Sequence, residues 1–256
     1  MTALIGIYCQ DGVVIGADSA ATSATAGGQP TVEQPILKIN IIAGKLIIAG
    51  TGAVGLGQRF NAVIDKLWQT NGFRNQDEIG FAKTAAVAGI KDFGETGATK
   101  GSYGALMAYP CKDMRNRQGL HLVEFSAQDF QPEQKNSSLW YVSMGSGQNI
   151  IDPFLAFMRE IFWKDGPPRV QDGVFAATWL LDHAVRVNPG GVNSPVRIAT
   201  LENSGSGPLA RLLEDDELLE HRQYQRAAKD ALRNFKEYME LQSGAQNIPE
   251  PPKALS

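Results

Sequence analysis

Residues 2–19 read TALIGIYCQDGVVIGADS, and this stretch decides the fold of the chain. Residues 4–8 alternate and are rich in β-forming side chains, Asp11-Gly12 is a hairpin turn signal, and residues 13–17 form a second β-rich run. The two runs predict an N-terminal β-hairpin. Because the second strand returns to the level at which the chain starts, we expect Asp18 to lie close to Thr2.

Thr2 becomes the N-terminal residue if Met1 is removed, and a small second residue is what initiator-methionine trimming tolerates. A threonine hydroxyl is a poor nucleophile alone, but the adjacent free α-amine can accept its proton. That amine has an ordinary pKa of ~7.7–8.0, so a modest electrostatic lowering of this pKa leaves the amine substantially neutral near pH 7. Taken alone, Thr2 is also an ordinary second residue.

Lys38 is an isolated charge in the apolar run ILKINII at 36–42, which predicts a third strand. A lysine inside a half-buried strand is unfavourable unless it is paired, and Asp18 is the natural partner. Together Thr2, Asp18 and Lys38 would supply a nucleophile, an orienting carboxylate and a cation that lowers the pKa of the hydroxyl and the amine.

These runs, with IAG at 48–50, resemble a proteasome β subunit or an HslV-type bacterial peptidase. The resemblance covers roughly residues 2–201 and is most specific in the first fifty. It implies an N-terminal nucleophile hydrolase that cleaves peptide bonds inside stacked rings and uses no cofactor or metal.

Carried over residue by residue, the resemblance makes Thr2 the nucleophile, Asp18 the acid that closes the second strand, and Lys38 the lysine of the site. Gly50 takes the place of the glycine whose N–H donates to the oxyanion, where a substrate carbonyl must approach the main chain closely. The turn between Lys38 and Gly50 is shorter than the family's and needs an alignment gap. Ser146, in GSG at 145–147, matches the serine near the threonine amine; without the resemblance, GSG is simply a strand-to-helix turn.

The same resemblance places Ala21, Thr22, Ile36 and Ile48 at the border of the first substrate pocket. Their small or apolar side chains favour a small apolar substrate residue there.

One part of the family pattern fails. The family has an Asp, and three residues later a Ser, before a Gly-Gly pair; here RVNPGG at 186–191 puts Arg186 and Pro189 at those positions. Proline has neither an N–H nor a hydroxyl. Asp182 lies one helical turn before Arg186 and either points the same way or pairs with Arg186 at the surface. The departure raises the prospect of reduced or unusual activity.

The order of elements supports an α+β fold: a four-layer αββα sandwich of the N-terminal nucleophile hydrolase type with an extra C-terminal helix. After the first strands, helical spacing occurs at 53–70 and 77–93 and again at 148–163 and 171–187. Strand patterns occur at 102–109, 119–126, 138–144 and 194–201.

Composition narrows the function classes. A net charge of -3 with no basic stripe argues against nucleic acid as a partner, and no apolar run approaches the ~18 residues of a membrane span. Cys9 and Cys111 have no metal or redox spacing and are expected to be core thiols of a cytoplasmic protein. His121, His183 and His221 share no ligand spacing.

The chain is expected to form one domain over 2–203, a C-terminal amphipathic helix within 208–243 and a disordered tail over 244–256. Apolar residues recur at helical spacing between about 212 and 242. That helix either folds back on its own subunit or packs on a neighbouring one.

Three functions fit the sequence. The first is a threonine peptidase in self-assembled stacked rings of six or seven subunits, acting on peptides or unfolded proteins and compatible with an ATP-dependent unfoldase as partner. The second is a catalytically weak or silent ring-forming scaffold, favoured by Arg186 and Pro189. The third is an N-terminal nucleophile amidase acting on a small amide, which the lack of a long insertion around Gly50 disfavours.

Overall fold

The computed structural model describes residues 2–24, 30–98, 101–113, 115, 117–188 and 191–241, with the backbone alone for 22–24, 30–32 and 241. The chain divides into two compact units, of which the first ends at Leu213 and the second begins at Glu214. The first unit carries the candidate site.

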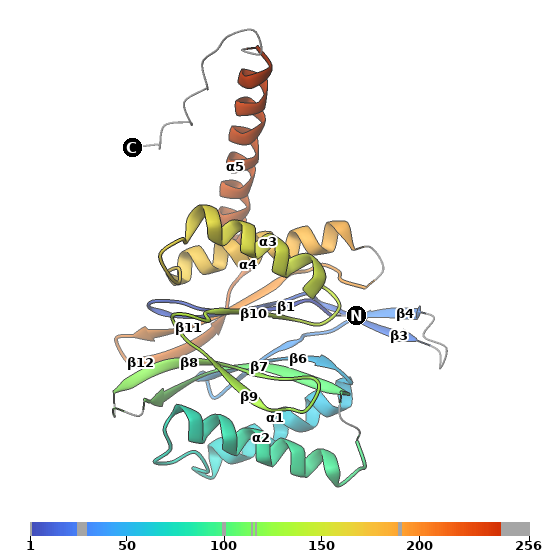
Figure 1. Cartoon of the computed structure of the whole chain (residues 1–256). Helices are drawn as coiled ribbons and strands as arrows, with labels where there is room; N and C mark the ends of the chain where they lie inside the picture. The colour runs from blue at the N-terminus through green and yellow to red at the C-terminus, as the bar shows by residue number, and fades with distance from the viewer. Residues whose placement is uncertain are drawn as a thin grey trace. The chain divides into compact units, whose positions relative to one another are not determined.

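Two five-stranded antiparallel sheets form the middle of the first unit (Figure 1). The first sheet has the order β10-β1-β2-β11-β12. Its strands are β1 (Leu4–Tyr8), β2 (Gly12–Ala17), β10 (Tyr141–Met144), β11 (Arg197–Ser204) and β12 (Gly207–Leu212). The second has the order β5-β6-β7-β8-β9. Its strands are β5 (Ile39–Ile42), β6 (Leu46–Gly52), β7 (Tyr103–Lys112), β8 (Gln118–Phe125) and β9 (Pro132–Lys135).

Helices cover the outer face of each sheet (Figure 1). The helices α1 (Val54–Gln69) and α2 (Glu78–Gly94) lie on the second sheet, and α3 (Gln148–Phe162) and α4 (Val170–Val187) lie on the first. The four layers confirm the expected αββα sandwich. The helix bounds lie within one or two residues of those that the apolar spacing predicts.

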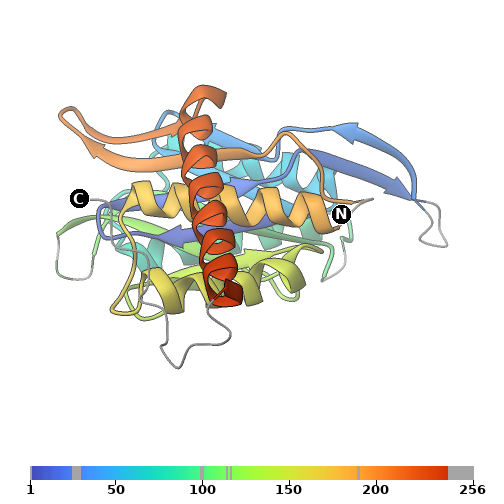
Figure 2. The ribbon, with the colours of Figure 1, turned by 90° about the horizontal axis from the view of Figure 1, so that it is seen from above.

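A two-stranded ribbon, β3 (Ala20–Ala24) and β4 (Pro30–Pro35), projects from one end of the sandwich (Figure 2). The sequence analysis did not anticipate it, because its residues are small or polar and lack an alternating apolar pattern. The ribbon leads the chain from Asp18, at the end of β2, to Lys38, just before β5.

The strand β6 is buried on both faces along its apolar run. Along β6, Leu46 and Ile48 pack in the cluster against α1 and α2, whereas Ile47 and Ala49 pack in the cluster between the two sheets. Side chains alternate between the faces of a strand, so a continuous apolar run is what a doubly covered strand requires.

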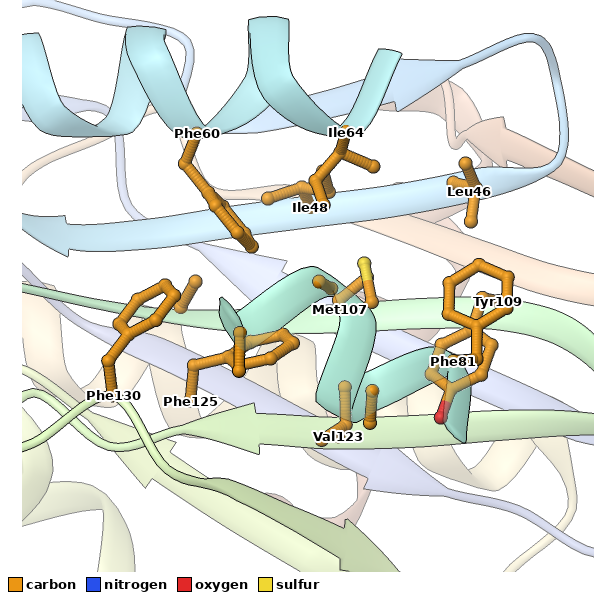
Figure 3. Close-up of a cluster of buried hydrophobic side chains, with 14 of the residues drawn as sticks. Leu46, Ile48, Phe60, Ile64, Phe81, Met107, Tyr109, Val123, Phe125 and Phe130 are labelled. Atoms are coloured by element: carbon orange, nitrogen blue, oxygen red, sulfur yellow. The ribbon is translucent and has the colours of Figure 1, made fainter. Parts of the chain in front are cut away.

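Aromatic side chains dominate the cluster beneath α1 and α2 (Figure 3). Phe60 and Ile64 reach from α1 toward Ile48, and Phe81 of α2 stacks on Tyr109 with ring centroids 4.2 Å apart. This packing fixes α1, which forms one wall of the candidate site.

Two expectations about element positions are wrong. Lys38 precedes β5 rather than lying within a strand. Residues 208–212, placed in the C-terminal helical segment, belong to β12 (Gly207–Leu212), which pairs with β11 from Ala199↔Leu212 to Ser204↔Gly207. The Ser-Gly-Ser-Gly stretch at 204–207 closes the hairpin between the two strands.

The second unit contains α5 (Asp215–Leu241). Three acidic residues occupy its first turn, where they complement the positive end of the helix dipole. Large apolar side chains, among them Leu232 at 63% exposure, are open to solvent along its length. The expected tail over 244–256 lies outside the described residues.

Candidate active site

The turn Gly145-Ser146-Gly147, between β10 and α3, wraps tightly around Thr2. The Thr2 N–H donates to Ser146 Oγ at 3.1 Å, and the Gly147 N–H donates to the Thr2 carbonyl at 3.0 Å. Gly145 has φ +88°, and a Cβ there would collide with the Thr2 carbonyl oxygen. Only glycine suits that position, so the turn holds residue 2 in a fixed orientation.

Asp18 lies beside Thr2 because of the register of the β1–β2 hairpin. Leu4 pairs with Ala17, and the Asp18 N–H donates to the carbonyl of Ala3 at 3.1 Å. The Asp18 carboxylate is fully buried. It accepts hydrogen bonds from the backbone N–H groups of Ala3 at 2.9 Å, Ala20 at 3.2 Å and Asn193 at 3.3 Å.

Lys38 links the carboxylate to the hydroxyl. Its Nζ lies 2.6 Å from Asp18 Oδ1 and 3.2 Å from Thr2 Oγ1, and its side chain is only 6% exposed. Burial lowers the pKa of the Lys38 ammonium below its usual value, while the Asp18 carboxylate opposes that shift. The structure thus brings Thr2, Asp18 and Lys38 into one hydrogen-bonded group.

Gly50 lies on the open edge of β6 next to this group. The β5–β6 ladder ends at the Ile39↔Ala49 pair, whereas Gly50 still pairs with Ala105 of β7. A Cβ on Gly50 would collide with the hydroxyl of Tyr103 and lie 2.6 Å from its Cε2. The close approach of Tyr103 is therefore what requires glycine here.

A cavity of about 420 Å³ opens between Thr2, Gly50 and α1. Ala21 and Ile36 line it, as the resemblance implies, and so does Ser146. Ile48 instead is 1% exposed and packs in the cluster beneath α1. The side chain of Thr22 lies outside the described residues.

Several polar residues of this region are not predicted from the sequence. Asn40, Gln58, Asn61 and Tyr103 line the cavity, and Asn193 contributes its N–H to Asp18. The Asn193 side chain also donates to Glu33 Oε1 at 2.5 Å. Gln58 and Asn61 lie within the helix predicted at 53–70, but nothing in the sequence indicates which face of that helix borders the cavity.

Arg186, at the family's acid position, contacts a neighbour on its own helix: its guanidinium donates to His183 Nδ1 at 2.9 Å, one turn earlier on α4. Pro189 lies outside the described residues. Cys9 and Cys111 are unpaired and buried, as expected for core thiols.

Within the described ranges no three His, Cys, Asp or Glu side chains gather as they would around a metal ion. No helix in the described part of the chain combines the length and apolarity that a membrane span requires.

Comparisons with known proteins agree with this architecture. A family model described as "Proteasome subunit" matches residues 2–156. Among solved structures, the chain is similar to an Anbu (Gly-1) mutant from Hyphomicrobium sp. strain MC1, with a TM-score of 0.66 and 14% identity over 98% of this chain and 99% of that one. It is also similar to Anbu, described as an ancestral beta-subunit, from Yersinia bercovieri, with a TM-score of 0.67 and 13% identity over 91% of this chain and 96% of that one. At such identities the two structures support the fold alone. A search of curated proteins found no match.

Proposed function

The chain belongs to the proteasome subunit family, and from that premise we propose that it is a threonine peptidase with Thr2 as its nucleophile once Met1 is removed. One observation carries the proposal. The ammonium of Lys38 lies 3.2 Å from Thr2 Oγ1 while a fully buried carboxylate, Asp18, holds it at 2.6 Å. A buried lysine held against a hydroxyl by a carboxylate is suited to stabilising negative charge on that oxygen.

In the proposed mechanism the Thr2 hydroxyl attacks the carbonyl carbon of the scissile peptide bond, and the free α-amine of Thr2 takes the hydroxyl proton. The Gly50 N–H stabilises the oxyanion. The α-ammonium returns the proton to the leaving amine as the C–N bond breaks, which leaves an ester on Thr2 Oγ. The amine then takes a proton from a water molecule that attacks the ester carbonyl, and the resulting ammonium returns a proton to Thr2 Oγ as the C–Oγ bond breaks, which releases the acid product and restores the hydroxyl.

Ser146 and Lys38 have supporting roles in this scheme. Ser146 Oγ lies 3.1 Å from the nitrogen of Thr2, which becomes the amine after Met1 removal, and orients it. Lys38 supplies positive potential at the hydroxyl. Asp18 keeps the ammonium in place and needs no proton transfer of its own.

The proposal extends to assembly. A reactive N-terminal threonine next to an open cavity would act on any flexible peptide in the cytoplasm, and enclosure in a ring chamber restricts its access. Identical subunits that pack head to tail close into rings, and self-complementary faces allow rings to stack. We expect six or seven subunits per ring in at least two rings. The expected substrates are peptides or unfolded proteins, and such an assembly is compatible with an ATP-dependent unfoldase as partner.

The nucleophile is tested by intact mass spectrometry before and after treatment with a peptide epoxyketone or β-lactone. The untreated mass should correspond to loss of Met1, and treatment should add one inhibitor per chain. The Thr2→Ala variant should not be labelled, whereas Thr2→Ser should keep some reactivity because a hydroxyl next to a free amine remains. Equal labelling of wild type and Thr2→Ala would refute the assignment.

A silent ring-forming scaffold is the second candidate, and Arg186 favours it. The family's acid is absent at that position, and the Arg186 guanidinium contacts His183 rather than the group around Thr2. A protein that assembles and loses Met1 but is never labelled would support the scaffold.

Assembly is tested by light scattering of the full chain and of a chain ending at Leu213, the last residue of the first unit. Smaller or less stable assemblies after truncation would indicate that α5 bridges subunits. A stable full-length monomer would refute the ring proposal.

A further inference from the structure

Polar side chains line the cavity beside the small and apolar ones that the resemblance implies. Four residues of α1 line it at the spacing of one helix face, and two of the four are polar: Val54, Gly57, Gln58 and Asn61. Because Gly57 has no side chain, the edge of the Tyr103 ring comes close to the helix, 3.1 Å from where a Gly57 Cβ would lie. The Tyr103 hydroxyl therefore borders the cavity.

No described residue forms a hydrogen bond with the Tyr103 hydroxyl, and although the residue is only 6% exposed, the hydroxyl is not sealed off from the cavity that it lines. Its ring is held by Phe60, Phe93 and Phe130, with centroids 5.9 to 6.1 Å away. Buried tyrosine hydroxyls ordinarily find a partner. Tyr109, in the same aromatic cluster, follows that rule and donates to the Glu78 carbonyl at 2.7 Å. A ligand in the cavity, which Tyr103 lines, can supply that partner.

The Asn61 amide, on α1, also lacks a hydrogen-bond partner. Its Oδ1 is buried and accepts no hydrogen bond from any described residue. Rotating the Asn61 amide by 180° exchanges its oxygen and its NH₂ group, so either end of this unsatisfied amide can face the cavity that Asn61 lines. Two unsatisfied polar groups on one cavity indicate a ligand that supplies both a donor and an acceptor.

The charges around the cavity limit which substrate side chains fit it. Lys38 is the only charged residue lining the cavity in the described ranges, and Asp18 already pairs with it. A cationic substrate side chain would find no counter-ion there, and an anionic one would have to compete with Asp18. A neutral side chain with hydrogen-bonding atoms fits best.

We propose that this cavity selects a carboxamide side chain, glutamine or asparagine, on the residue whose carbonyl Thr2 attacks. The carboxamide oxygen would accept from the Tyr103 hydroxyl, and its NH₂ would donate to the Asn61 amide. Because a carboxamide carries both a donor and an acceptor, it complements Asn61 in either orientation of that amide. The inference rests on the proposed function, since it assumes that a peptide carbonyl is positioned between Thr2 and Gly50.

The test compares peptide substrates that differ only at that residue. Glutamine is matched in size by methionine, which lacks the hydrogen-bonding groups, and by glutamate, which adds a charge. A site built to hydrogen-bond its substrate strongly rejects analogues without those groups, so kcat/KM should favour glutamine over methionine by about 10- to 100-fold. Glutamate and lysine should also be poor.

Variants assign the preference to the two residues. Tyr103→Phe removes only the hydroxyl, and Asn61→Leu replaces the amide with an apolar group of similar shape; each should bring the glutamine-to-methionine ratio toward one. Tyr109→Phe is the matched control, because that hydroxyl is bound to the Glu78 carbonyl and does not line the cavity. It should keep the wild-type ratio.

The carboxamide pocket and the proposed peptidase function can be refuted separately. If Thr2 is labelled by a β-lactone and peptides are cleaved with no preference for glutamine, the carboxamide pocket is refuted while the peptidase stands. If Thr2 is never labelled, the peptidase is refuted, and binding decides the pocket. Peptides ending in glutamine should then bind the Thr2→Ala variant at least 10-fold more tightly than those ending in methionine in calorimetry, and equal or absent binding would overturn the proposal.

Discussion

Replacing Lys38 with methionine tests the buried ion pair around which the candidate site is organised. The change keeps the length of the side chain and removes its charge. Asp18 is then left fully buried without its cation, and breaking a buried pair on one side typically costs ~3–5 kcal/mol. Asp18 keeps three backbone N–H donors, at 2.9, 3.2 and 3.3 Å, which partly compensate its charge. We therefore expect a loss near the lower end, ~3 kcal/mol.

For a unit of this size that loss corresponds to a fall of about 6–12 °C in Tm, at about 2–4 °C per kcal/mol. Thermal and denaturant unfolding measure it, and β-lactone labelling should be lost in the same variant. Desolvation of both groups offsets much of the attraction within a buried ion pair, so the intact pair is expected to add little net stability. The double variant Asp18→Asn, Lys38→Met should for that reason recover most of the loss. Wild-type stability in Lys38→Met, or strict additivity in the double variant, would refute this reasoning.

Three further predictions follow from the same geometry. The rate of β-lactone inactivation should rise with pH as the Thr2 α-amine loses its proton near ~7.7–8.0. As the pH rises further, the rate should fall again before pH 10.5 is reached, because burial lowers the pKa of Lys38 below that usual value and its charge is lost earlier. A rate still rising at pH 11 would contradict this. Gly50→Ala should lose about 1–3 kcal/mol in denaturant unfolding through its collision with the Tyr103 ring, and clearly less in a Tyr103→Leu background; equal losses in both backgrounds would rule out that contact. Phe60→Ala, at a fully buried position among four aromatic rings, should lose about 3–5 kcal/mol, and a loss under about 1 kcal/mol would show that the cluster repacks.

Several features could be predicted from the sequence because they depend on residues close together in the chain. The Asp11-Gly12 turn and the flanking apolar runs define the first hairpin, and its register alone brings Asp18 to Thr2. Apolar residues at helical spacing define α1 to α4 to within one or two residues. The αββα order follows from the sequence of these elements and from the resemblance of the first fifty residues to a proteasome β subunit.

Local pattern misled the prediction where tertiary pairing decided the structure. Residues 207–212 lie beside a helical segment in sequence, but β11 offers them an open edge with unpaired backbone groups, and they form β12. Lys38 sits in an apolar run typical of a strand, yet β5 begins only at Ile39, because the lysine bends toward Asp18 and Thr2.

The walls of the cavity were decided by tertiary structure alone. Tyr103 and Asn61 come from β7 and α1, and no spacing in the sequence relates them to Thr2. The sequence determined the chemical groups at the candidate nucleophile, because a hairpin and one lysine position them. The residues that line a substrate cavity depend on which faces of distant elements meet. Only the packing of α1 and β7 against the edge of β6 brings the Asn61 amide and the Tyr103 hydroxyl to this cavity.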